Sequence, residues 1–250
     1  MIAALGLGLL LLQAAPVTSP PAYPFQVGEH LEYSAKLGML QLGSAQLDVA
    51  RIDTVRGAES FVFQFRLSSH TIFFDADDLM ESYTGTADMV SRLFRQDYLE
   101  NDKRRLRTYQ IFPDRQVYYQ EGKPDTLATP PDPIDDAAFF YFLRTTPLEV
   151  GQTYKYQRYF KLDQNPIQIE VTGREEMELP DGSKVNCLVL HPVVRTDGMF
   201  SKRSNTRLWL TDDARRIPVQ IRSRFPFGTV TLRLEEMRLG PAPADSVAGG

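Results

Sequence analysis

An alternation of apolar and polar residues with a period of two is the feature that most constrains how this chain can fold. The pattern covers residues 61–67, 167–171, 217–221 and 230–234. Because successive side chains of a strand point to opposite faces, each segment is predicted to be a strand with one face on a core and the other in water. In the third segment, the residues predicted to share the core face are Ile217, Val219 and Ile221.

Turn residues separate the predicted strands. The sequences at 113–115, 180–182 and 226–228 each combine Pro with Asp or Gly. Pro presets the φ angle of a turn, and Asp and Gly tolerate its tight geometry, so a hairpin is predicted at each place. The 17 prolines of the chain also argue against long helices. The expected fold is therefore all-β and mainly antiparallel, either a large curved sheet or an open, half-barrel-like sandwich.

One segment departs from the strand pattern. Residues 135–144 are predicted to form a short helix, because Asp135 is a suitable N-cap and a run of alanines, aromatic residues and leucine follows it. The apolar side of this helix is wide, so the helix is expected to be buried across one end or one face of the sheet.

The N-terminus predicts export. Residues 2–12 are apolar and uncharged, and small residues follow them. A run of about ten residues is too short to cross a bilayer core of about 30 Å, so it fits the apolar region of a secretory signal. We assign a signal peptide to residues 1–15, with cleavage after Ala14, and a Pro-rich tether to residues 16–24. No Lys or Arg precedes the run, and the alternative is a buried N-terminal helix.

The remaining chain is predicted to be one β-rich domain, residues 25–239, followed by a disordered tail at 240–250. A second possibility is two similar β halves, 25–128 and 148–239. It follows from the similarity of two segments, each a Gly turn leading into a strand that bears tyrosine: 27–33 and 150–156. The alternative is that both segments share only a common way of starting a strand.

The sequence contains no motif for catalysis, a cofactor or a metal. Its three histidines lack metal-ligand spacing, and the single cysteine, Cys187, is expected to be a buried small apolar residue. The acidic cluster at 75–81 fails as a calcium loop because Leu79 and Met80 stand at its fifth and sixth positions, so it is expected to be a solvated bend. The formal net charge of −4 provides no strong field, so nucleic acid is not an expected partner.

Two basic clusters precede or enter predicted strands, one at 103–107 and one at 202–203 before the strand of Trp209. They are suited to anionic headgroups or polysaccharide. The alternative is a charged outer face that keeps sheet edges soluble. The candidate binding residues are Arg104, Arg105, Arg107 and Trp209.

Several motifs resemble the bacterial exported family catalogued as domain of unknown function 3108. Residues 25–33 match an F-x-x-G-E-x-L-x-Y segment, residues 132–144 resemble the family's helix ending in Arg, and residues 209–219 match its W…D-D…R-R-x-P segment. The resemblance spans roughly residues 25–237 and implies an exported, mostly antiparallel β protein. It implies no activity and therefore no catalytic residues.

Three functions remain open. The first is non-enzymatic binding of an amphiphilic, lipid-like ligand in an apolar groove lined by some of the 15 Phe and 11 Tyr residues. The second is a structural or assembly factor that docks on another envelope protein or on polysaccharide. The third is a cell-wall hydrolase with a carboxylate pair that no motif marks. In each case the expected location is periplasmic or envelope-associated, with no transmembrane span once the signal is removed and no cofactor.

Overall fold

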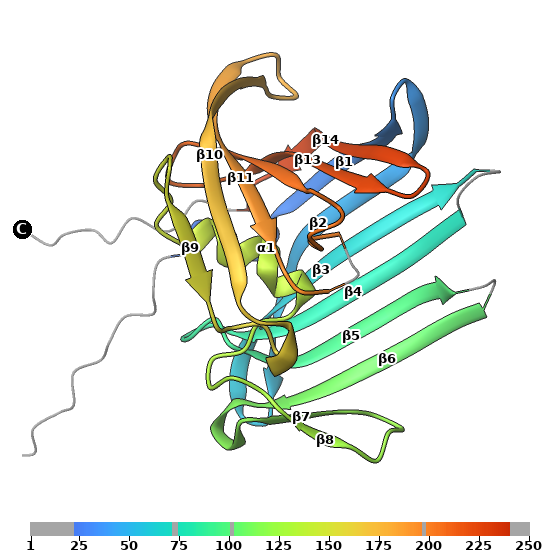
Figure 1. Cartoon of the computed structure of the whole chain (residues 1–250), viewed down its shortest axis with the longest axis vertical. Coiled ribbons are helices and arrows are strands. Elements are labelled where there is room, and N and C mark those ends of the chain that lie inside the picture. The colour runs from blue at the N-terminus through green and yellow to red at the C-terminus, as the bar shows by residue number, and fades with distance from the viewer. Residues whose placement is uncertain (1–22, 72–74, 101–102, 197–198, 241–250) are drawn as a thin grey trace, which may run out of the picture.

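The computed structural model describes residues 23–71, 75–100, 103–196 and 199–240, and within them the chain forms a single 14-stranded sheet and one α-helix. Every ladder between named strands is antiparallel, and the sheet curves without closing (Figure 1). The predicted fold class is confirmed: a mainly antiparallel β protein, with a large curved sheet that stays open and one short helix.

The strands, in chain order, are β1 His30–Leu37, β2 Leu40–Val55, β3 Ala58–His70, β4 Asp75–Gly85, β5 Ser91–Glu100, β6 Lys103–Phe112, β7 Val117–Gln120, β8 Thr126–Ala128, β9 Thr153–Tyr156, β10 Ile167–Glu178, β11 Lys184–Val193, β12 Arg207–Thr211, β13 Pro218–Phe225 and β14 Gly228–Arg238. The helices are α1 Asp136–Thr145 and the 3₁₀ turns η1 Pro113–Arg115 and η2 Leu162–Gln164. The three hairpins predicted from Pro, Asp and Gly lie at β6–β7, β10–β11 and β13–β14.

The described chain enters the sheet at its middle. It runs outward from β1 to the edge strand β8, and α1 follows. It then returns from the opposite edge strand, β9, to β14, which pairs with β1 (Figure 1). The two strands farthest apart in the sequence are therefore neighbours at the centre of the sheet.

The turns that start the two halves share one geometry. Gly28 has φ +89° and Gly151 has φ +86°, a conformation that glycine adopts without a steric penalty. Their N–H groups donate to the carbonyls of Val49 and Val171, respectively, each at 2.8 Å. In both halves a register shift follows immediately after that valine, in the pairing with the next strand. This shared geometry supports the division into two similar β halves, and that division stays a prediction.

The helix α1 occupies the concave face of the sheet, and its residues 137–144 are all buried (Figure 1). The Tyr141 ring stacks on Phe63 with centroids 3.9 Å apart, and the Phe140 ring stacks on Phe65 at 5.2 Å. Most of the predicted aromatic groove is therefore a filled core, because the helix supplies the side chains that close it.

The opposite face of the sheet carries a second, small cluster around Trp209, with Cys187, Val189 and Val219. Our prediction that Val219 shares a face with Ile217 and Ile221 was wrong. The β12–β13 pairing shifts register between Trp209 and Leu210, and the shift turns Val219 toward Trp209.

The structure corrects the expectation for the acidic cluster at 75–81, and most of the predicted terminal segments lie outside the described residues. The acidic residues at 75–81 belong to strand β4 and not to a bend, and Asp77 pairs with Arg104 at 3.1 Å. The assigned signal, nearly all of the tether and residues 241–250 of the tail lie outside the described residues. The last two tether residues are described, and there Tyr23 stacks on Phe25 with centroids 5.2 Å apart.

The N-cap of α1 is expected to make a pH-dependent contribution to stability. The Asp135 carboxyl accepts hydrogen bonds from the N–H groups of Ala137 and Ala138 at 3.0 Å and from the Ser82 hydroxyl at 2.6 Å. Burial nevertheless raises the pKa of Asp135 to about 7, and those hydrogen bonds oppose the rise. Between its usual pKa and pH 7 the folded state holds the proton more tightly than the unfolded chain does.

We therefore expect the Asp135 contribution to the free energy of unfolding to fall as the pH rises from about 4 to about 7, with a limiting slope of about 1.4 kcal/mol per pH unit. Urea unfolding of the wild type and of Asp135→Asn at several pH values measures it. Asparagine keeps an acceptor for the cap, so the variant should lose the Asp135 contribution and show a shallower slope in this window. Equal slopes in both proteins would contradict the assignment.

Candidate functional site

An apolar pocket of about 260 Å³ remains open where α1 does not fill the concave face; we call it the rim pocket. It lies at the end of the sheet that carries the β1–β2 and β13–β14 turns, residues 38–39 and 226–227, which we call the rim. Its walls are the inward faces of strands β1–β4, β13 and β14, together with Met199. The residues that line it are Ala35, Leu42, Phe65, Leu67, Ser69, Asp78, Met199, Ile221, Ser223, Phe225, Phe227, Val230 and Leu232.

The pocket has a polar margin. The hydroxyl of Ser69 donates to the Leu42 carbonyl at 2.8 Å, and the hydroxyls of Ser223 and Thr206 lie 2.7 Å apart. Burial raises the pKa of the Asp78 carboxyl, and a hydrogen bond from the N–H of Leu99 at 3.1 Å opposes the rise. The serines are thus already bonded within the protein, and the open wall is left to apolar carbon.

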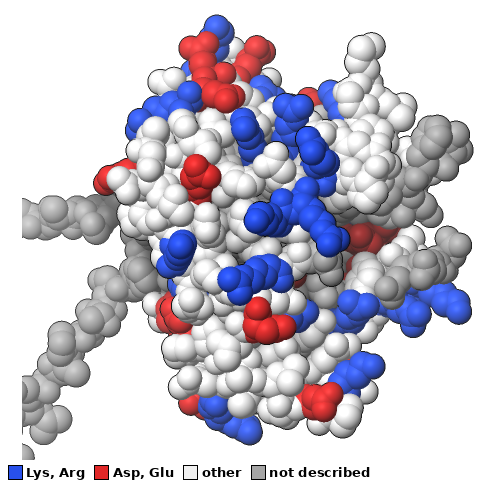
Figure 2. Space-filling model, in the orientation of Figure 1, with Lys and Arg blue, Asp and Glu red and all other residues white. Residues whose placement is uncertain are grey.

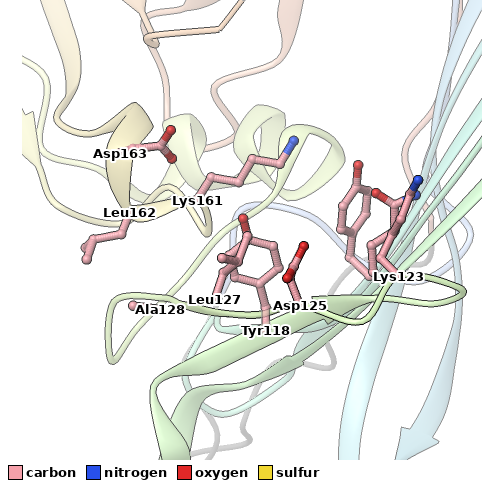
Figure 3. Close-up of a pocket in the computed structure, with 10 residues that line it drawn as sticks. Tyr118, Lys123, Asp125, Leu127, Ala128, Lys161, Leu162 and Asp163 are labelled. Carbon is pink, nitrogen blue, oxygen red and sulfur yellow. The ribbon is translucent and has the colours of Figure 1, made fainter.

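A second opening, the seam cleft, lies where the sheet fails to close. It has a volume of about 630 Å³ between the β7–β8 hairpin and residues 161–163. Figure 3 shows Tyr118, Asp125 and Leu127 rising from the hairpin toward Lys161. The Lys161 ammonium lies 5.1 Å from the Tyr109 ring centroid and 5.3 Å from that of Phe160.

The electrostatics of the seam cleft follow from partial burial. Burial lowers the pKa of Lys161, although the nearby Asp136 carboxylate opposes this, and burial raises the pKa of Tyr118 to about 12. Two carboxylates, Asp125 and Asp163, line the cleft, but both are exposed. A general acid in a glycosidase-type pair is usually desolvated, so these two are poorly placed for the hydrolase alternative.

Cys187, His30 and His191, to which sequence analysis gave no catalytic or metal-binding role, are buried or hydrogen-bonded within the protein. Cys187 is fully buried, and burial raises the pKa of its thiol to about 12, which disfavours the reactive thiolate. His30 lies with Nδ1 2.6 Å from an Asp48 oxygen, and His191 with Nδ1 2.8 Å from the Thr206 carbonyl. Within the described ranges, no three His, Cys, Asp or Glu side chains gather as metal ligands.

The four candidate binding residues do not form one site. Arg104, Arg105 and Arg107 lie on β6, whereas Trp209 lies on β12, and seven strands separate the two in the sheet order. The Arg104 guanidinium pairs with Asp97 at 2.7 Å and with Asp77 at 3.1 Å.

Two of the others also have partners. The Arg107 guanidinium lies 4.7 Å from the Tyr98 ring centroid, and the Trp209 indole donates to the Glu175 carboxylate at 2.8 Å. Their role in binding stays a prediction.

Sequence reasoning missed a buried ion pair that joins three motifs of the family resemblance. The Arg144 side chain, 1% exposed, makes a bidentate contact with the Glu29 carboxylate, 3% exposed. Its remaining donors reach the carbonyl of Arg215 at 3.1 Å and that of Pro24 at 3.0 Å. All of these partners come from segments distant in sequence, so no local pattern could have shown the pairing.

This geometry defines an open, β-barrel-like antiparallel protein with an internal helix. The chain belongs to the family described as protein of unknown function DUF3108, whose model matches residues 32–235. The family resemblance read from the sequence is confirmed. A search of the curated proteins finds no match. No helix within the described ranges has the length and apolar character needed to cross a membrane.

A search of solved structures finds similar chains at low sequence identity. A β-barrel-like protein of the domain of unknown function DUF1849 from Brucella abortus has a TM-score of 0.52 and 9% identity, over 87% of this chain and 99% of that one. A lipoprotein candidate from Parabacteroides distasonis has a TM-score of 0.30 and 10% identity, over 86% and 97%. A candidate exported protein with a YmcC-like fold from Bacteroides fragilis has a TM-score of 0.30 and 11% identity, over 88% and 100%.

Proposed function

We propose that this chain is an exported, non-enzymatic protein of the bacterial cell envelope that binds the acyl part of an amphiphile in the rim pocket. The observation that carries the proposal is the pocket itself, an opening in the concave face that is lined almost entirely by apolar carbon. Ligand sites are typically concave and mostly apolar, with a few polar groups that orient the ligand.

The size of the pocket restricts the ligand. Sites for whole drug-sized ligands have volumes of about 300–1,000 Å³. The rim pocket, at about 260 Å³, lies just below this range. It therefore suits one acyl segment whose polar head stays at the margin, and not an entire lipid.

Export is supported by the sequence, through the apolar residues 2–12 with small residues after them. The absence of catalysis is supported by the environment of the reactive groups. The one cysteine is buried as a thiol, and the two carboxylates of the seam cleft are exposed.

The first test is recovery of a native ligand. The full chain purified from envelope extracts, after solvent extraction and mass spectrometry, should release a fatty acid or another molecule with a single inserted acyl chain. A preparation that carries no amphiphile and instead co-purifies with a stoichiometric envelope protein would favour the assembly-factor alternative.

The second test fills the pocket. Val230 lines it from β14, so Val230→Trp should lower the affinity for a fluorescent long-chain fatty acid by at least about tenfold, because the indole occupies the space of the acyl chain. Gln46→Trp, on β2 outside this lining, is the matched control and should bind like the wild type. Unchanged affinity in a folded Val230→Trp variant would refute the proposed site.

A further inference from the structure

The two ends of the sheet differ in the chemistry of their turns. At the end opposite the rim, the turns at 56–57, 113–116, 180–183 and 212–216 contain no large apolar residue, and Met89 and Val90 of the turn at 86–90 are buried. Turn tips are usually polar, because they face water and need Gly, Pro, Asn or Asp. At the rim, the two central turns instead present Met39 and Phe227.

These apolar residues are exposed and lie on neighbouring hairpins. Met39 is fully exposed, Leu40 is 46% exposed and Phe227 is 49% exposed. The β1–β2 and β13–β14 hairpins lie side by side here, because Leu37 pairs with Leu40 on one side and with Val230 on the other. The rim therefore carries exposed apolar residues on two neighbouring hairpins next to the rim pocket.

Basic side chains lie just behind this tip on the outer face of the sheet. Arg222 pairs in register with Arg207 on β12, and Arg224 with Thr229 on β14. The three arginines line a hollow of about 270 Å³ together with Asn205 and Thr229. Figure 2 shows Lys and Arg side chains gathered over the part of the molecule where Figure 1 draws the β13–β14 hairpin.

The three guanidinium groups have no carboxylate partner among the described residues, in contrast to Arg104 with its two aspartates. Like charges on neighbouring strands repel each other, so their proximity is unfavourable unless an anion joins them. Arginine is well suited to phosphate because its planar donors can bind two oxygens at once.

We propose that the rim docks on a bilayer that contains anionic phospholipid. Met39, Leu40 and Phe227 enter the interfacial region, and Arg207, Arg222 and Arg224 contact lipid phosphates. A membrane fits both features, because apolar tips inserted beside a basic surface are the usual basis of peripheral binding. Docking in this orientation also brings the mouth of the rim pocket to the lipid surface. The proposal goes beyond the proposed function and does not depend on a ligand in the pocket.

Vesicle sedimentation of the full chain tests the docking. The protein should sediment with vesicles of equal parts phosphatidylglycerol and phosphatidylcholine, and much less with phosphatidylcholine alone. Added salt should weaken the binding, because it screens exposed charges. Equal binding to both vesicle types, or binding to neither, would overturn the proposal.

Paired variants test the surface itself. The double variant Met39→Glu/Phe227→Glu should lose at least about tenfold in partitioning, because carboxylates cannot enter the interface. Ile52→Glu is its control, since Ile52 is 49% exposed near the opposite end of β2. Arg222→Glu/Arg224→Glu should abolish the preference for anionic vesicles, whereas Arg115→Glu, at the opposite end, should preserve it.

The outcomes separate the two proposals. If the rim variants bind vesicles as well as the controls do, the docking surface is refuted whatever happens in the pocket. Val230→Trp should lose fatty-acid binding and still sediment with anionic vesicles. Fatty-acid binding therefore tests the pocket, and sedimentation tests the docking surface.

Discussion

Replacement of Arg144 by methionine is expected to lower the free energy of unfolding by about 3–5 kcal/mol. The substitution leaves the Glu29 carboxylate buried without its charged partner, and it also removes the donors to the carbonyls of Arg215 and Pro24. The segments that contain Pro24 and Arg215 would then lose their hydrogen bonds to α1. Urea unfolding followed through the fluorescence of the single tryptophan, Trp209, measures the loss.

The control for this prediction removes both charges. Glu29→Leu/Arg144→Met should recover much of the stability lost in Arg144→Met, because a buried ion pair replaced by apolar residues of similar volume is often neutral or stabilising. Arg144→Lys should be destabilised as well, since a lysine cannot reproduce the bidentate contact. A single variant as stable as the wild type would show that the pair contributes little to folding.

The second large effect is expected from Phe140→Ala, at about 3–5 kcal/mol. The Phe140 ring lies between Phe65 and Phe200, with centroid distances of 5.2 Å to each. Its removal leaves a cavity directly behind Phe65, which lines the rim pocket. We therefore expect the variant to be less stable and to accept a bulkier acyl ligand than the wild type does.

Two measurements check this expectation. Urea unfolding gives the stability, and competition by branched or longer fatty acids against a fluorescent one gives the ligand range. Phe112→Ala is a suitable control, because Phe112 is only partly buried and lies at the opposite end of the sheet. An unaltered ligand range in a folded Phe140→Ala protein would mean that the cavity and the pocket stay separate.

The fold was largely predictable because its signals are local. The alternation at 61–67 and the turn at 180–182 each follow from a few neighbouring residues, and so does the N-cap at Asp135. The prediction failed at Val219 because a bulge inserts one residue into the ladder, and such an insertion leaves no mark in an apolar pattern.

The sites were much less predictable because they depend on distant contacts. Arg104 was a reasonable binding candidate until the sheet placed Asp77 and Asp97 beside it. Arg222 and Arg224 were not selected, because nothing in their own segment shows that Arg207 lies on the adjacent strand. The location of the rim pocket depends on which part of the sheet α1 covers, and composition does not predict that position.

The central β1–β14 ladder sets the order in which the protein can fold. The hydroxyl of Ser34 donates to the Glu235 carboxylate across a separation of 201 positions in the chain. The chain must lose the entropy of closing this long loop before the contact forms, so the pairing of β1 with β14 is expected to be slow. Until the segment around residue 235 is available to pair, β1 therefore keeps one unpaired edge, which a holding chaperone could protect.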